Sequence, residues 1–283
     1  MTGRIPARAL RLAAAGFGAA AMLAMSAGAA SASETLYSNQ PAAKPKPGNL
    51  VSQAFEATST SEFGGEVELA GGPHIAQSVQ IGMSSWACET GTWTGPSECI
   101  TAKGAKFEWP LTVNIYNVGP ANTIGSLIKS VTQTVKIPYR PSQNNKKCTG
   151  ESAGAWWDMY AKECFHGKFA KVSIKLGKVS VPAQVIVTVA YNTSDYGAVP
   201  QRPQPCNSTT AGCPYDSLNV AVAEPSTETA TPTVGSDPAP ADAYLSSTWG
   251  GAYCDGGLAG TGSLRPDLGC WLGYQPLIAI KGM

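Results

Sequence analysis

Apolar and polar residues alternate with a period of two through most of the chain, and this alternation restricts the fold more than any other feature. Such alternation is typical of antiparallel strands with one buried face. No segment sustains the 3.6-residue repeat of an amphipathic helix. We identify about nine to eleven strand segments by this criterion. The clearest are residues 55–58, 66–69, 79–83, 111–115, 131–137, 172–176, 185–190, 218–222 and 277–280.

The strand segments and the turn-forming residues between them predict the fold class. Residues 185–190 are apolar on both faces, which predicts a strand in the centre of a sheet. The best helical candidate is the short segment Ser152–Cys164. Because Gly 31 and Pro 21 together favour turns over long helices, we predict an all-β chain. The specific expectation is an antiparallel β-sandwich of jelly-roll type with disulfide-braced loops.

The first 32 residues have the three parts of a secretory signal peptide. Arg4, Arg8 and Arg11 form a positive region, Leu12–Met25 is apolar, and Ala30–Ala32 supplies a small-residue cleavage pattern. We therefore predict a secreted, extracellular protein. No later stretch is long and apolar enough for a transmembrane helix, so we expect no membrane span after cleavage.

Proline-rich stretches indicate how the rest of the chain is divided. Residues 33–50 are expected to form an extended lead-in, and residues 51–283 a single β-sandwich domain. Residues 224–242 are rich in Pro and Thr and predict a long loop inside that domain.

The charge content is low, and its balance excludes one class of partner. Charged residues make up 14% of the chain, against about 25% in an average soluble domain. Removing the three arginines of the signal peptide from 20 basic residues leaves 17 against 19 acidic residues. A nucleic-acid partner is not expected, because such proteins carry a clear basic excess. The basic residues concentrate between Lys129 and Lys178, which we interpret as solvated strand faces.

All the cysteines follow the signal peptide, and their spacing predicts the disulfides. An even number in an exported chain indicates disulfide bonds. The cysteines form four near pairs separated by long intervals, so sequential bridges are the simplest scheme. The predicted bridges are Cys88–Cys99, Cys148–Cys164, Cys206–Cys213 and Cys254–Cys270.

Aromatic residues cluster in or beside the disulfide loops. Flat rings on rigid loops suit stacking against sugar rings, because they offer a large amphipathic contact area at low entropic cost. Trp86, Trp109 and Trp271 are instead expected to pack in the core or on disulfides. The candidate ligand-binding residues are Trp93, Trp156, Trp157, Tyr160, Trp249 and Tyr253.

Carboxylates offer two further possibilities. A glycosidase needs one acid and one base or nucleophile on opposite sides of the scissile bond. The candidates in aromatic-rich segments are Asp158, Glu163, Asp195, Asp216, Asp255 and Asp267. A structural Ca²⁺ ion could use carboxylate and carbonyl oxygens near a strand end. Its candidate ligands are Glu62, Glu66 and Asp267, and no other cofactor is expected.

Five phrases of the sequence carry a resemblance: Ala57–Gly65, Met83–Cys88, Ile137–Pro141, Ala190–Gly197 and Tyr215–Val220. Together they resemble a group of uncharacterised secreted proteins of actinobacteria and other soil bacteria. The resemblance spans Tyr37 to Gln275 and implies an extracellular β-rich protein, with no activity attached.

The sequence therefore favours a secreted, non-enzymatic β-sandwich that binds a ligand or surface, with extracellular polysaccharide or a cell-surface polymer as the expected partner. Two alternatives stay open. One is a glycoside-active enzyme with a carboxylate pair, and the other is a structural matrix protein. A cleft with two carboxylates about 5–10 Å apart would favour the enzyme. Exposed tryptophans in a row would favour the binding protein.

Overall fold

The computed structural model describes residues 33–41, 50–72, 74–93, 98–201, 213–225 and 231–283. Within these ranges the chain forms strands, turns and short 3₁₀ turns, and no α-helix. No helix among the described residues could cross a membrane. Residues Ala32–Met283 form one compact unit.

Six of the strands form sheet A. Strands β1 (Glu34–Ser38), β14 (Ile278–Gly282), β4 (His74–Ser85), β11 (Leu218–Ala221) and β2 (Ser52–Ala54) follow one another, and β9 (Lys168–Val181) pairs with β4. All these pairings are antiparallel. Strand β4 is central because β9 covers one edge while β14 and β11 share the other.

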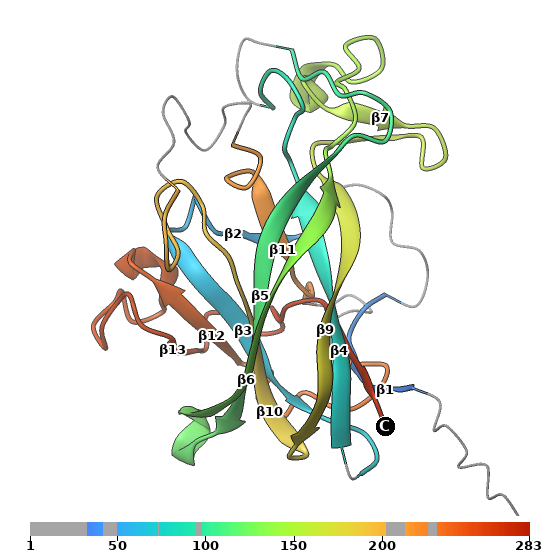
Figure 1. The fold of residues 1–283 in the computed structure, drawn as a ribbon. Coiled ribbons are helices and arrows are strands. Elements are labelled where there is room, and N and C mark those ends of the chain that lie inside the picture. The colour runs from blue at the N-terminus through green and yellow to red at the C-terminus, as the bar shows by residue number, and fades with distance from the viewer. Residues whose placement is uncertain (1–32, 42–49, 73, 94–97, 202–212, 226–230) are drawn as a thin grey trace, which may run out of the picture. The chain divides into compact units, whose positions relative to one another are not determined.

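Six further strands form sheet B, also antiparallel (Figure 1). Their order is β13 (Arg265–Leu268), β12 (Asp242–Ser247), β3 (Thr60–Glu68), β10 (Gln184–Ala190), β5 (Lys106–Val118) and β6 (Ile124–Pro138). Strand β10 lies between β3 and β5, which confirms the prediction of a central strand at residues 185–190. Strands β7 (Trp156–Asp158) and β8 (Glu163–Phe165) form a separate hairpin.

The two sheets contribute to one hydrophobic core. Ile81 and Met83 of sheet A and Leu111 and Val113 of sheet B belong to a single cluster of buried side chains, and none is measurably exposed. The alternating partners of these residues point away from the core, as the period-two pattern requires. The predicted all-β, antiparallel fold is therefore confirmed, whereas its jelly-roll connectivity stays a prediction.

Three predictions about local structure are wrong. The strand expected at residues 55–58 is a turn between β2 and β3. Ser152–Cys164 is not helical: it holds the end of a 3₁₀ turn (Gly150–Ser152) and the β7–β8 hairpin. Gly154 and Lys162 have φ angles of 81° and 55°, which a continuous α-helix excludes. Residues 34–38 are not part of a lead-in, because they form β1, with Leu36 and Tyr37 buried. Residues 1–32 and 42–49 lie outside the described residues.

The predicted loop at residues 224–242 is partly tethered, and two strands follow it that the sequence did not indicate. Val234 pairs with Ser38 and Ser236 with Glu68 in isolated β-bridges. Strands β12 and β13 come next. Strand β12 is only six residues long, its sequence does not alternate, and it directly follows a proline-rich run. It therefore carries no clear period-two signal.

Candidate functional site

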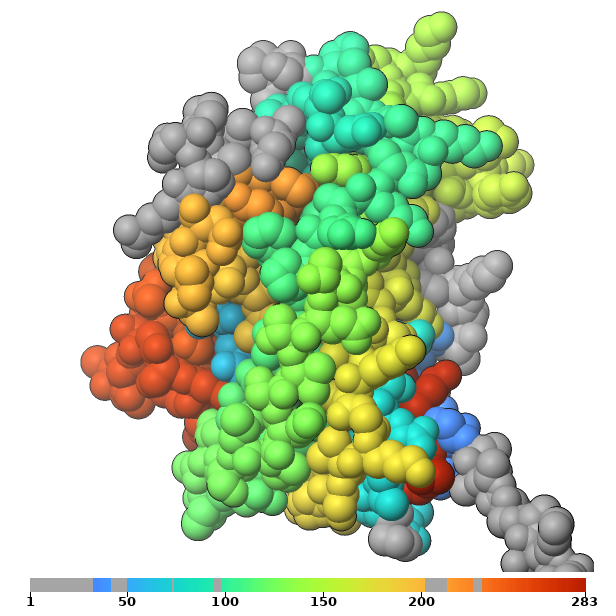
Figure 2. Space-filling model, viewed as in Figure 1, coloured from blue at the N-terminus to red at the C-terminus, as the bar shows by residue number. Residues whose placement is uncertain are grey.

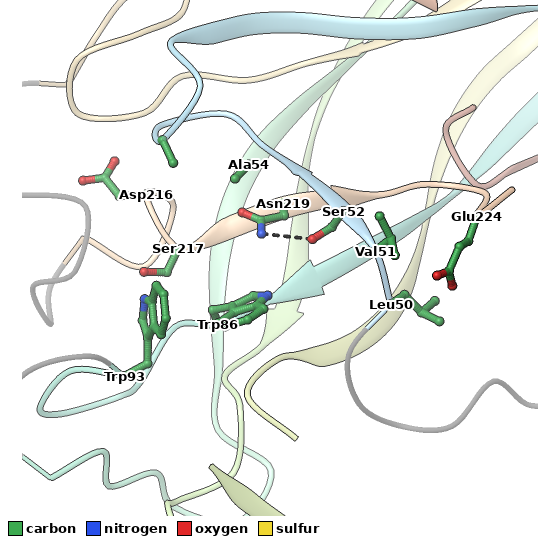
Figure 3. A pocket seen from close by; sticks show the side chains of 11 residues that line it. Leu50, Val51, Ser52, Ala54, Trp86, Trp93, Asp216, Ser217, Asn219 and Glu224 are labelled. Carbon is green, nitrogen blue, oxygen red and sulfur yellow. Dashed lines mark hydrogen bonds between the residues drawn. The ribbon is translucent and has the colours of Figure 1, made fainter. Parts of the chain in front are cut away.

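A cavity of about 590 Å³ lies beside β2, and we call it the aromatic groove. Its lining combines two tryptophans with apolar, polar and acidic residues. The set is Leu50, Val51, Ser52, Ala54, Ala57, Trp86, Trp93, Asp216, Ser217, Asn219 and Glu224. Figure 3 shows Asp216 towards one end and Glu224 towards the other, with Ser52 and Asn219 between them. Asn219 Nδ2 donates to Ser52 Oγ at 3.1 Å, across the β2–β11 pair.

The rings of the two tryptophans in the groove contact each other edge to face. Trp86 follows β4 directly, and its backbone N–H donates to Ser217 O at 2.8 Å. The ring centroids of Trp86 and Trp93 are 4.7 Å apart, and the ring planes meet at 68°. On its other side Trp86 stacks on His166, at 5.8 Å and 7°. Edge-to-face and stacked contacts of this kind fix ring orientation.

A disulfide fixes the loop that carries Trp93. Cys88 and Cys99 are bonded with their Cα atoms 5.4 Å apart, and Trp93 lies between them in sequence. Next to the bridge, Thr90 and Ile100 exchange backbone hydrogen bonds of 3.0 Å. The cross-link and the short ladder together restrict the positions that the Trp93 ring can adopt.

A buried arginine connects this region to the second disulfide loop. Arg140 has no exposed surface, and its guanidinium donates to the carbonyl oxygen of Gly154 at 2.6 Å. Its backbone N–H donates to Ala87 O at 2.9 Å. Burial lowers the pKa of Arg140 to about 10, so the side chain is still a cation at neutral pH. Arg140 thus links the Cys148–Cys164 loop to the residue before Cys88.

Asp216, at one end of the groove, is held in place by hydrogen bonds from Ser194. Ser194 donates to it twice, from its backbone N–H at 2.7 Å and from its hydroxyl at 2.6 Å. Burial raises the pKa of Asp216, and the hydrogen bonds from Ser194 oppose that shift. Burial likewise raises the pKa of the neighbouring Glu56. Since both oxygens of Asp216 are engaged, we assign it a structural role and not one in proton transfer.

The structure does not bring the predicted aromatic residues together in one platform. Trp93 lines the aromatic groove. Trp156 is only 3% exposed, and its indole N–H donates to Gly167 O at 3.0 Å. Trp157 lies in β7, 5.7 Å below the Lys147 ammonium. Tyr160, in the turn between β7 and β8, is 93% exposed.

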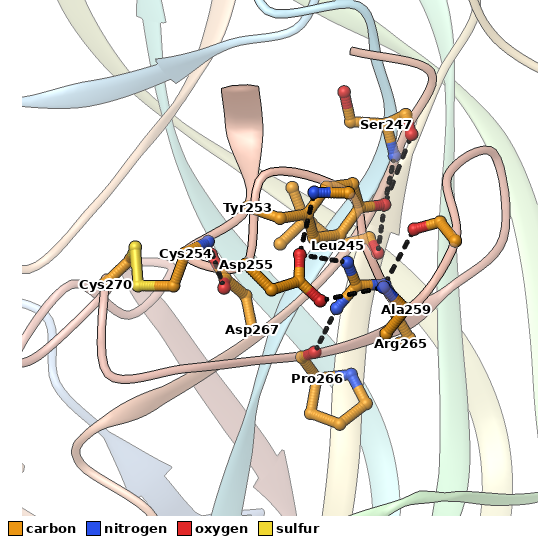
Figure 4. A network of polar contacts seen from close by, with 12 residues as sticks. Leu245, Ser247, Tyr253, Cys254, Asp255, Ala259, Arg265, Pro266, Asp267 and Cys270 are labelled. Atoms are coloured by element: carbon orange, nitrogen blue, oxygen red, sulfur yellow. Dashed lines mark hydrogen bonds and ion pairs between the residues drawn. A yellow bond between two sulfur atoms is a disulfide. The ribbon is translucent and has the colours of Figure 1, made fainter. Parts of the chain in front are cut away.

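Trp249 and Tyr253 belong to the region around the third disulfide, Cys254–Cys270. Trp249 is exposed and lines an adjoining cavity of about 410 Å³, together with Trp271. This cavity shares Val51 and Ser52 with the aromatic groove. Tyr253 is buried; its hydroxyl accepts from the Ser247 backbone at 2.9 Å, and the Arg265 guanidinium covers its ring at 3.8 Å (Figure 4).

Trp86 and Trp271 line cavities, although the sequence assigned both to packing roles. The packing role is also present, because each ring packs on another aromatic ring. The sequence reasoning missed only their place in the cavity linings. Trp109 does pack as expected: it stacks on Tyr215 with the ring centroids 3.9 Å apart. The available signal was proximity to a cysteine, since Trp86 lies two residues before Cys88 and Trp271 directly follows Cys270.

Three of the four predicted disulfides are confirmed: Cys88–Cys99, Cys148–Cys164 and Cys254–Cys270. The fourth, Cys206–Cys213, lies outside the described residues because Cys206 does. Disulfides of this kind fit an oxidising, extracellular setting.

The predicted calcium ligands are not brought together. Within the described ranges, the one close group of three potential ligands is Cys254, Asp267 and Cys270. Its two sulfurs form a disulfide and cannot act as thiolate ligands. Asp267 instead accepts from the Cys254 backbone N–H at 2.7 Å (Figure 4). Glu62 and Glu66 lie on β3. Glu62 accepts a hydrogen bond from Asn114, and Glu66 accepts one from Tyr244.

The predicted glycosidase carboxylates do not gather in one cavity, although Asp195 lies near Asp216 and Asp255 lies near Asp267 (Figure 4). Only Asp216 of the six candidates lines the aromatic groove. Asp158 accepts backbone N–H bonds in the β7–β8 turn, and Asp255 pairs with Arg265 at 2.8 Å. Asp195 and Glu163 line neither the aromatic groove nor the adjoining cavity.

No protein-family model, curated protein or solved structure matches this chain.

Proposed function

We propose that this chain is a secreted, non-enzymatic protein of the jelly-roll sandwich class that binds carbohydrate through the aromatic groove. The observation that carries the proposal is the Trp86–Trp93 pair, fixed beside the polar residues Ser52, Ser217 and Asn219. Rigid indole faces supply stacking area for a sugar ring, and hydroxyl and amide groups can bond its hydroxyls. The signal-peptide pattern and the disulfides support secretion.

The glycoside-active alternative has less support than the binding function. It needs a second carboxylate opposite Asp216, and the other acid in the lining, Glu224, lies towards the far end of the groove (Figure 3). A purely structural role would leave the groove without a ligand. Binding assays separate these alternatives.

Retention on insoluble chitin, cellulose and peptidoglycan tests the proposal. The oxidised wild-type protein is expected to bind at least one of these polymers. Trp93→Ala removes one stacking face and is expected to weaken retention about tenfold, the equivalent of about 1.4 kcal/mol. Thermal unfolding of the variant shows that it is folded.

Tyr160→Ala is the matched control, because Tyr160 is an exposed aromatic residue outside the groove lining. It is expected to bind like the wild type. Failure of the wild type to bind any of the three polymers would refute the proposal. Equal weakening by Trp93→Ala and Tyr160→Ala would also refute it, because the groove would then have no special role.

A further inference from the structure

A third cavity, of about 540 Å³, lies on the outer face of sheet B, and we call it the polar groove. Its lining includes Glu62, Thr112, Asn114, Ser130, Thr132 and Asn192. In Figure 2 the blue atoms of β3 are visible in a hollow between the green β5–β6 strands, the gold segment after β10 and the red C-terminal region. Unlike the aromatic groove, it contains no tryptophan.

Strand register places the polar side chains of this groove in rows. Glu62 lies opposite Ala190, Ala190 opposite Thr112, and Thr112 opposite Thr132. In the next row Thr188 lies opposite Asn114, and Asn114 opposite Ser130. Side chains in such rows project from the same face of the sheet. Hydroxyl and amide groups therefore extend across three strands beside one carboxylate.

The Glu62 carboxylate is held by three donors at one oxygen. Oε1 accepts from Asn114 Nδ2 at 2.8 Å, from Tyr116 Oη at 3.0 Å and from the Thr188 hydroxyl. Burial and the Glu62 charge raise the pKa of Tyr116, so its hydroxyl stays a donor. The side chain is thus fixed before any ligand arrives.

The other oxygen of Glu62 is open. Within the described part of the chain, Oε2 has no hydrogen-bond partner, and Glu62 has no ion-pair partner. Among the residues that the structure describes, no Lys, Arg or His lines the groove. The groove therefore holds a fixed negative charge whose counter-charge is not supplied by the residues that line it.

This arrangement selects the chemistry of a ligand. An open carboxylate oxygen binds an ammonium group through a charge-assisted hydrogen bond. The rows of hydroxyl and amide groups suit a ligand rich in hydroxyls. Tyr191, the one aromatic residue in the lining, is only 4% exposed and stacks on Phe55, so it offers little stacking area. We propose that the polar groove is a second binding site, specific for amino sugars with a free, protonated amine.

The test uses isothermal titration calorimetry with the tetramer of glucosamine at pH 6, where its amines are largely protonated. The tetramer of N-acetylglucosamine, which has no charge, is the matched neutral ligand. The wild type is expected to bind the glucosamine tetramer, with an affinity that falls as salt is added. Glu62→Gln keeps the shape of the side chain and removes its charge, so we expect about a tenfold loss of affinity.

Two control variants locate the effect. Glu108→Gln removes an exposed carboxylate of β5 that pairs with Lys136 outside the groove, and it should bind like the wild type. Trp93→Ala should also bind the glucosamine tetramer normally, because the polar groove does not depend on the aromatic groove. The two proposals can therefore fail separately.

Several results would overturn the inference. These are the absence of binding by the wild type, equal affinity of Glu62→Gln, and equal binding of the neutral tetramer in the polar groove. Loss of binding in Trp93→Ala would place the amine in the other groove. If Glu62→Gln does not fold, Thr112→Val is the second variant. It removes one hydroxyl of the row, and unchanged affinity there would count against the site.

Discussion

The two grooves are positioned by different means. The aromatic groove depends on the loop that the Cys88–Cys99 disulfide closes and on Arg140, which connects it to the Cys148–Cys164 loop. The polar groove is built mainly on paired strands, where the register of β3, β10, β5 and β6 places each side chain. Cross-links restrict a loop by covalent bonds, whereas a ladder positions residues by many backbone hydrogen bonds. The two sites should therefore respond to different perturbations.

The largest expected effect comes from removing the first disulfide with Cys88→Ser and Cys99→Ser. A bridge across a loop of this length stabilises a fold by about 3 kcal/mol through the entropy of the unfolded chain. We expect the free energy of unfolding to fall by about that amount. Binding of neutral polysaccharide should weaken, and the affinity for the glucosamine tetramer should persist. Denaturant unfolding and calorimetry measure the three quantities.

The Cys254→Ser and Cys270→Ser pair is the matched control. This bridge closes a segment that contains Gly262, which lines the polar groove. Its removal should weaken glucosamine binding more than removal of the first bridge does. If either double variant weakens both ligands equally, the grooves are not independent.

A smaller effect on stability is expected from the buried carboxyls near Glu66. Glu66 lies on the same face of β3 as Glu62 but is buried. Glu66 is 3% exposed and accepts from the Tyr244 hydroxyl at 3.0 Å. Burial raises the pKa of Glu66. Burial also raises the pKa of Asp237 to about 6, and the negative charge of Glu66 contributes to that rise. A carboxyl whose pKa is raised by folding stabilises the protein at low pH and loses that contribution as pH rises.

Asp237→Asn tests whether the raised pKa of Asp237 makes the stability of the protein depend on pH. The variant is expected to be more stable than the wild type at pH 7, by an amount on the order of 1 kcal/mol after solvent screening is allowed for. The difference should shrink as pH falls through about 6 towards 4. Denaturation midpoints of both proteins between pH 4 and 7 measure it.

Asp255→Asn supplies a contrast of opposite sign. The hydrogen bond from Arg265 lowers the pKa of Asp255, so this carboxylate stabilises the protein at neutral pH and loses that contribution only below about pH 4. Asp255→Asn should therefore be less stable than the wild type at pH 7. A stability difference for Asp237→Asn that does not vary with pH would contradict the account.

The sequence predicted the strands well where the alternating pattern was long. Residues 79–83, 111–115, 172–176 and 185–190 all lie within strands of the two sheets. It failed for Ser152–Cys164, which forms a short hairpin in place of the expected helix, and for β12, which is short. Disulfide pairing was predictable because each confirmed bridge closes a loop of 11 or 16 residues.

Neither groove could be predicted in full from the sequence. The partners of Glu62 at Asn114 and Thr188 are 52 and 126 residues away along the chain, and only strand register brings them together. Asp216 and Trp86 meet in the aromatic groove for the same reason, through the β4–β11 pair. Loop aromatics such as Tyr160 resembled ligand-binding residues because composition alone does not show which rings share a cavity.

The independence of the two sites can be measured most directly by ¹⁵N NMR of the oxidised protein, since each of the seven tryptophans contributes one indole N–H signal. A soluble oligosaccharide of the polymer that retains the protein is expected to shift the Trp86 and Trp93 indole signals and to leave the Asn114 side-chain amide unchanged. The glucosamine tetramer is expected to do the reverse. Displacement of both sets of signals by either ligand would contradict two separate sites.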